Sequence, residues 1–143
     1  MESTLQNPAL VAAKFSLKAM AIAYWIVTAL FCLEMSFTAY YELLPQGAQA
    51  FARLGFPAGY FRMELSFAKL LGVAALLVPV VPARLKEWAY AGFAINLVSA
   101  LITHLSLGQG PAAVSPSAIT SVLWALSYFF WRRLNSAGSG PLA

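Results

Sequence analysis

The chain has 143 residues, of which 61% are hydrophobic and only 10% charged, whereas about 25% of the residues of soluble domains are charged. This composition excludes an ordinary soluble domain, and the length leaves room for one membrane domain. The formal net charge of +4 does not indicate a nucleic-acid partner, because the basic residues form no patch with interleaved aromatic side chains.

Four apolar segments follow one another along the chain, at residues 20–44, 63–81, 88–107 and 116–131. Each is close to the roughly 20 residues that a helix needs to cross about 30 Å of hydrocarbon. None has the polar outer face of a soluble helix. We therefore predict an all-α fold, an integral membrane four-helix bundle over residues 20–133, between an N-terminal segment (1–19) and a disordered tail (134–143).

The boundaries of these segments carry local signals. Lys14 and Lys18 precede the first apolar run as in a signal peptide, but the run is much longer than the roughly 7 to 15 apolar residues of such a peptide. Asn7 before Pro8 suits a helix cap and a first helical residue, which predicts a short juxtamembrane helix over 8–18. Pro57 belongs to an expected loop turn between the first two segments.

The basic residues predict how the bundle is oriented. Six of them fall on the side that holds both termini and the second connection, namely Lys14, Lys18, Arg84, Lys86, Arg132 and Arg133. The other side has only Arg53 and Arg62. By the positive-inside rule, both termini are expected in the cytoplasm, with Arg84 and Lys86 at the headgroups.

Several kinds of centre are not expected from the residue types. Cys32 is the single cysteine, so an intrachain disulfide, a CxxC redox pair and a cysteine-held iron–sulfur cluster are excluded. One histidine and no aspartate argue against an all-protein metal or haem site, and no nucleotide-binding motif is present.

Three ionisable residues within the apolar segments are the candidate catalytic residues: Glu34, Lys69 and His104. A charge in the bilayer centre costs about 2.5 to 3.5 kcal/mol on insertion scales and normally faces a bundle interior with a partner. At about 1.5 Å per helical residue, all three lie in the half of the bilayer away from the cytoplasm. We therefore expect Glu34 and Lys69 to form an ion pair.

Other polar residues share helical faces with these three, and they are candidates for ligand binding: Thr38, Ser66, Asn96 and Thr103. Together they predict a polar pocket that opens away from the cytoplasm. A purely structural role stays open for both groups of residues. Small and hydroxyl residues commonly pack membrane helices, and the charged residues could be a structural ion pair and a hydrogen-bonded boundary histidine.

The middle of the sequence resembles the DoxX-like membrane proteins over about residues 24–132. The matching residues are Leu54–Pro57, Lys69–Gly72, Pro79, Pro82, Arg84–Phe93 and His104, and the run from Lys86 to Phe93 is the most distinctive. The resemblance implies four helices. Some relatives are described as parts of membrane oxidoreductase systems, including quinone-linked ones, and more distant bundles act as chaperones or cargo receptors.

Two functions follow from these observations. The first is an accessory or quinone-binding subunit of a membrane oxidoreductase system, expected in a bacterial inner membrane, in which Glu34, Lys69 and His104 transfer protons near a bound lipophile such as a quinone. Its partners would be the lipid bilayer and either a redox enzyme or further copies of the chain. The second is a non-catalytic assembly or chaperone-like protein, in which the polar residues only hold the bundle together.

Overall fold

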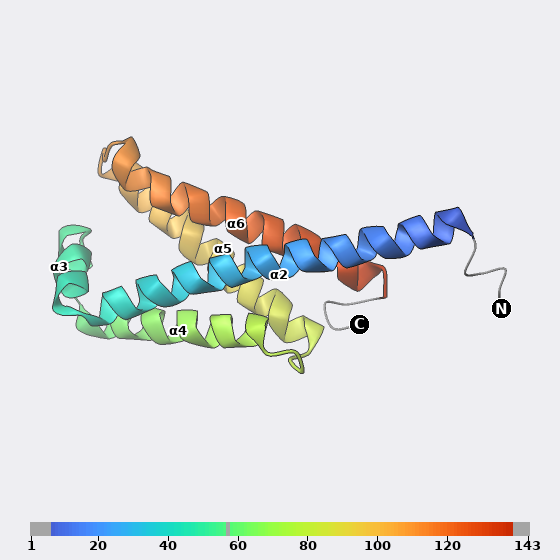
Figure 1. Cartoon of the computed structure of the whole chain (residues 1–143). Helices are drawn as coiled ribbons and strands as arrows, with labels where there is room; N and C mark the ends of the chain where they lie inside the picture. Colours follow the sequence, from blue (N-terminus) through green and yellow to red (C-terminus); the bar gives the residue numbers. More distant parts are fainter. Residues whose placement is uncertain (1–6, 57, 139–143) are drawn as a thin grey trace.

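A computed structural model describes residues 7–56 and 58–138. Within these residues the chain is helical without strands, as predicted (Figure 1). The helices are α2 (Pro8–Leu43), α3 (Pro45–Arg53), α4 (Gly59–Leu77), α5 (Ala83–Ser106) and α6 (Pro111–Ser136). Four of them correspond to the four apolar segments, and α3 is an additional short helix that the hydropathy pattern did not indicate.

Helix α2 is one continuous helix of 36 residues, about 54 Å long. It begins as expected, because the Asn7 side chain accepts a hydrogen bond from the backbone N–H of Ala9 at 3.0 Å and Pro8 follows as the first helical residue. The expected juxtamembrane helix and the first apolar segment are therefore parts of the same element. Its first turns are exposed and extend beyond the other helices (Figure 1).

The last helix is longer than predicted at both ends. It starts at Pro111 and continues to Ser136, and Leu134 is buried. Residues 134–136 are therefore helical, so the expectation of a disordered tail from residue 134 is wrong for them. The rest of that tail from residue 139, residues 1–6 and the expected turn residue Pro57 lie outside the described residues.

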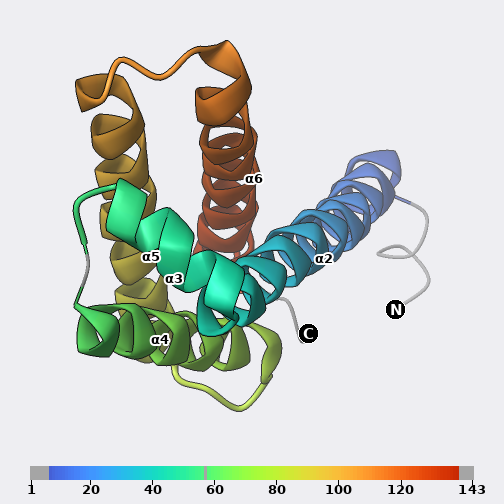
Figure 2. The same cartoon turned by 90° about the vertical axis from the view of Figure 1, so that its left-hand side faces the viewer.

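The four long helices form a ring in which each packs against two neighbours. Helix α2 contacts α4 and α6, and α5 contacts the same two helices from the opposite side. The pair α2 and α4 and the pair α5 and α6 diverge toward the end that holds the α5–α6 connection (Figure 1). Helix α3 lies across this end (Figure 2).

Among the described residues, three helices, α2, α5 and α6, are long and apolar enough to cross a membrane. Helix α4 has 19 residues and is set apart from these three by its three charged side chains, Arg62, Glu64 and Lys69. Large hydrophobic side chains on all four helices face outward, among them Leu33, Phe37, Leu71, Ile102 and Ile119. Such a surface suits contact with lipid.

The core combines aromatic packing with hydroxyl groups. The rings of Phe31 and Phe93 meet edge to face across the ring of helices, with centroids 5.0 Å apart. The Ser127 hydroxyl is 2.6 Å from that of Thr28 and 2.7 Å from that of Tyr90, so this buried cluster joins α2, α5 and α6.

Lys86 departs from its expected place at the headgroups. Its side chain is buried, and Nζ donates a hydrogen bond to the Leu76 carbonyl at 3.1 Å. This carbonyl lies in the last turn of α4, where backbone acceptors have no partner within the helix. Lys86 therefore caps α4 from inside the bundle.

Candidate functional site

A cavity of about 620 Å³ lies where the two helix pairs diverge, and residues of all five helices line it. Helix α3 contributes Ala50 and Phe51. Six of the seven predicted site residues line this one cavity: Glu34, Thr38, Lys69, Asn96, Thr103 and His104. Ser66 does not line it; the residue is fully buried behind the wall of the cavity.

Lys69 forms its ion pair with Glu42, a residue at the end of α2 that the sequence pattern did not single out. Both side chains are buried. The other carboxylate oxygen of Glu42 accepts a hydrogen bond from Ser66 at 3.0 Å, and the backbone carbonyl of Glu42 accepts one from Arg62. Three residues on one face of α4 thus converge on a single residue of α2, so Ser66 supports the ion pair.

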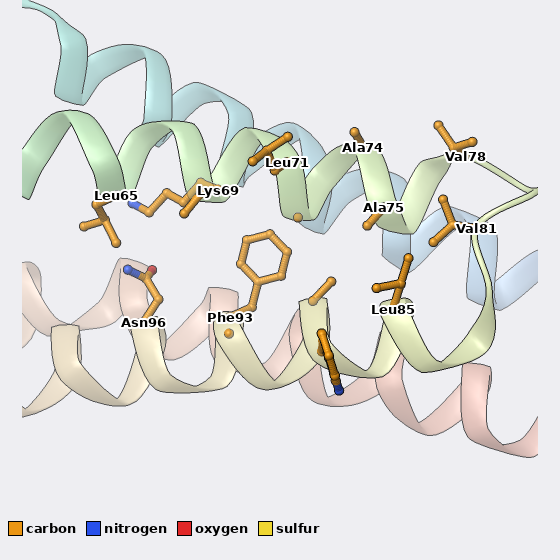
Figure 3. A pocket seen from close by; sticks show the side chains of 15 residues that line it. Leu65, Lys69, Leu71, Ala74, Ala75, Val78, Val81, Leu85, Phe93 and Asn96 are labelled. Carbon is orange, nitrogen blue, oxygen red and sulfur yellow. The ribbon is translucent and has the colours of Figure 1, made fainter.

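The expected Glu34–Lys69 ion pair is therefore wrong. Helical Cα–Cβ bonds tilt toward the N-terminus of their helix. The Lys69 side chain consequently extends toward the start of α4 and toward Leu65 (Figure 3). Because α2 runs in the opposite direction, the start of α4 lies beside the end of α2, which carries Glu42. Glu34 lies about 12 Å from Glu42, nearer the start of α2.

Glu34 instead pairs with a hydroxyl group of α6. Thr120 donates a hydrogen bond to Glu34 Oε1 at 2.5 Å, and its oxygen is also 2.8 Å from the Pro116 carbonyl. Thr120 is buried, Glu34 is half-buried, and both line the cavity. Glu34 therefore lines the cavity where α2 meets α6, whereas the Lys69–Glu42 ion pair lies where α2 meets α4.

The α5 wall carries the two remaining polar groups of interest. His104 Nδ1 lies 2.5 Å from the Gln109 Oε1 atom in the α5–α6 connection. With this oxygen as acceptor, Nδ1 carries the proton and Nε2 is left for another partner. The half-buried amide of Asn96 makes no hydrogen bond within the described residues, although it lines the cavity.

The hydroxyl groups of Thr38 and Thr103 line the cavity but bond to their own helices. They donate to the Met35 carbonyl at 3.0 Å and to the Ser99 carbonyl at 2.8 Å. Each oxygen keeps lone pairs with which it could accept a hydrogen bond from a ligand. Between these polar groups the walls are apolar, formed by side chains such as Phe51, Phe61 and Ile95.

Glu42 and Thr120 are the site residues that reasoning from the sequence missed. Glu42 could have been found from its position. It lies at the end of the first apolar segment, and the basic residue Arg62 lies just before the second segment, on the same side of the membrane. Nothing in the sequence distinguished Thr120 from the other hydroxyl residues of the fourth segment. Within residues 7–56 and 58–138, no group of three or more His, Cys, Asp and Glu side chains could hold a metal ion.

Long apolar helices define a small integral membrane protein, and they surround a cavity with a few polar residues. Residues 26–126 match the DoxX-like family, which is most of the chain, so the protein belongs to the DoxX-like family. No curated protein and no solved structure matches the chain.

Proposed function

We propose that the cavity binds a lipophilic molecule with carbonyl oxygens, such as a quinone, and that the protein is an accessory subunit of a membrane oxidoreductase system. One observation carries the proposal. Ionisable groups from three helices, Glu34, Lys69 and His104, line one largely apolar cavity together with an amide that has no protein partner among the described residues. Apolar walls with a few convergent polar groups are typical of small-molecule sites.

Lys69 and Asn96 are suited to hold one oxygen of the ligand. An ammonium group has three N–H donors, and Glu42 takes one of them. Glu42 also holds the ammonium in place at the cavity wall, so a remaining donor can make a charge-assisted hydrogen bond to a carbonyl oxygen. The Asn96 amide would supply a second donor at the same end of the cavity.

His104 and Glu34 are suited to exchange protons with the ligand. An imidazole nitrogen can accept or donate a proton, and the Nε2 atom of His104 is left for a partner by the contact with Gln109. The Glu34 carboxylate is held by Thr120 at the cavity wall. Electrons would be exchanged between the bound ligand and a partner protein, and the role of this chain is to hold the molecule and carry its protons.

The proposal is tested by substituting polar residues of the cavity and measuring the binding of a benzoquinone with a decyl tail in mild detergent. We expect His104→Leu and Asn96→Leu to weaken binding about tenfold or more, because each removes a buried hydrogen-bonding group. Asn135→Leu is the matched control, since Asn135 is exposed at the end of α6. Circular dichroism checks that each variant stays helical.

If His104→Leu, Asn96→Leu and Lys69→Met all bind the quinone as tightly as the parent protein does, the polar residues are structural. The assembly or chaperone-like function would then take the place of the ligand-binding one.

A further inference from the structure

A second hollow, of about 710 Å³, lies between α4 and α5 on the side toward the α4–α5 connection. We call it the α4–α5 groove. Small residues leave the space open, namely Ala68, Ala75, Ala89 and Gly92, whereas at Gly72 the Phe93 ring fills the space. Leu71 and Trp88 line it and are 72% and 68% exposed, so the groove opens on the outer, lipid-facing surface of the bundle.

The groove and the cavity adjoin each other. Four residues line both of them: Leu65, Lys69, Gly92 and Asn96. Figure 3 shows Lys69 and Asn96 at one end of the groove, on opposite helices. The Phe93 ring separates these two residues from the apolar part of the groove. Lys69 and Asn96 are thus the polar residues at the junction, and beyond Phe93 the lining has no charged side chain among the described residues.

We infer that the α4–α5 groove holds the hydrocarbon tail of the molecule whose polar head lies in the cavity, and that this molecule enters sideways from the bilayer between α4 and α5. The inference rests on the proposed function and adds the ligand class, an amphiphile with a carbonyl head and a long unbranched or prenyl chain. Leu85, near the far end, is about 16 Å from Asn96 along α5, which leaves room for such a chain.

A single amphiphile explains the chemistry of both hollows better than two separate occupants. The polar groups are confined to the cavity and the junction, and the walls become purely apolar toward Val78, Val81 and Leu85. A helix from a second copy would fill the apolar groove but would leave the polar groups at the junction without partners. These groups are the Asn96 amide, which has no partner among the described residues, and the two N–H donors of Lys69 that Glu42 does not take.

The test compares a tail-less benzoquinone with the same head carrying a decyl tail, in variants that fill the groove beyond the cavity. Ala75→Leu and Ala89→Leu are chosen because both residues line the groove but not the cavity. Ala91→Leu is the matched control on α5, since Ala91 is exposed and lines neither hollow. Some of the decyl compound dissolves in the detergent, and this lowers its apparent affinity for every variant equally. Comparing the same ligand between variants therefore removes this effect.

We expect the two groove variants to lose about tenfold in affinity for the decyl compound while binding the tail-less compound as the parent does. The Ala91→Leu variant should match the parent for both. If the groove variants bind the decyl compound unchanged, or if they only change the oligomeric mass in detergent, the tail inference is overturned while the head-group site stands. If the parent binds neither compound, the proposed function itself fails, and the inference fails with it.

Discussion

Glu42 organises the polar side of the bundle because it satisfies three groups of α4 at once. Its carboxylate accepts hydrogen bonds from Lys69 and Ser66, and its backbone carbonyl accepts one from Arg62. A buried carboxylate is tolerated only when it is paired and hydrogen-bonded. The same contacts fix the position of the Lys69 ammonium at the cavity wall, so the residue that stabilises the helix pair also prepares the site.

The Glu42–Lys69 ion pair should be visible as an energetic coupling. Glu42→Gln and Lys69→Met should each lower the free energy of unfolding by roughly 3 to 5 kcal/mol, because each leaves a buried charge unpaired, and the double variant should lose much less than the sum. The measurement is a double-mutant cycle of unfolding by SDS from mild detergent.

The matched cycle replaces Glu42→Gln by Glu34→Gln. It should be close to additive, since Glu34 bonds to Thr120 and not to Lys69. A larger coupling for Glu34 than for Glu42 would contradict the structure.

At the scale of single residues, the sequence predicted which polar groups share the cavity but not how they pair. Depth along a helix follows from counting residues, and this brought Glu34, Lys69 and His104 into one half of the bundle. Partners depend in addition on the direction in which each side chain leaves its helix and on the register between helices. The register could not be read from the sequence, and it placed Glu42 beside Lys69.

Helix α3 closes the end of the bundle where the cavity lies. The helix starts at Pro45, directly after α2, and supplies the Phe51 side chain to the cavity wall. Its close approach to α2 depends on Gly47, where a Cβ atom would lie 2.3 Å from the Tyr41 carbonyl oxygen and 2.7 Å from the Glu42 Cα atom. Both are backbone atoms that cannot turn aside.

Gly47→Ala should therefore displace α3. We expect faster hydrogen exchange of the backbone amides of residues 45–53 and weaker binding of a cavity ligand, because the Phe51 wall moves. Gly59→Ala is the control, since a Cβ atom there meets nothing within 4 Å and Gly59 lines neither the cavity nor the groove. Unchanged exchange over α3 in Gly47→Ala would show that the helix is not held by this contact.

The long helices were predictable from hydropathy, whereas α3 was not. Its nine residues have a mixed composition, so no apolar run marks it. The signals that it does carry are Pro45 at its first position and Gly55 just after its end, with a φ of +89°, but both also suit a plain loop. Its formation depends on packing against α2, which is a tertiary property.

For the whole molecule, the arrangement of the helices separates the basic residues as expected. Both ends of the described chain and the α4–α5 connection lie at one end of the bundle, and α3 and the α5–α6 connection lie at the other (Figure 1). Arg84, Arg132 and Arg133 are exposed at the first end. This distribution predicts that the first end faces the cytoplasm.

Single cysteines introduced into a Cys32→Ala background test that orientation. A cysteine at Arg84 should react with a membrane-impermeant maleimide only after the membrane is permeabilised, and one at Gly110 should react in intact cells, since both positions are exposed. The reverse pattern would invert the orientation of the bundle. Equal labelling of both after permeabilisation is the control.

The charges on α4 also determine how the chain can enter a bilayer. A charged side chain at the centre of a lone helix costs about 2.5 to 3.5 kcal/mol, and Lys69 lies near the middle of the 19 residues of α4. Glu42 is the partner of both Lys69 and Arg62. It is synthesised before α4 and lies at the C-terminal end of α2, beside the start of α4. Insertion of α4 by itself is therefore unfavourable, and the smallest unit that can be integrated is the helical hairpin made of α2, α3 and α4.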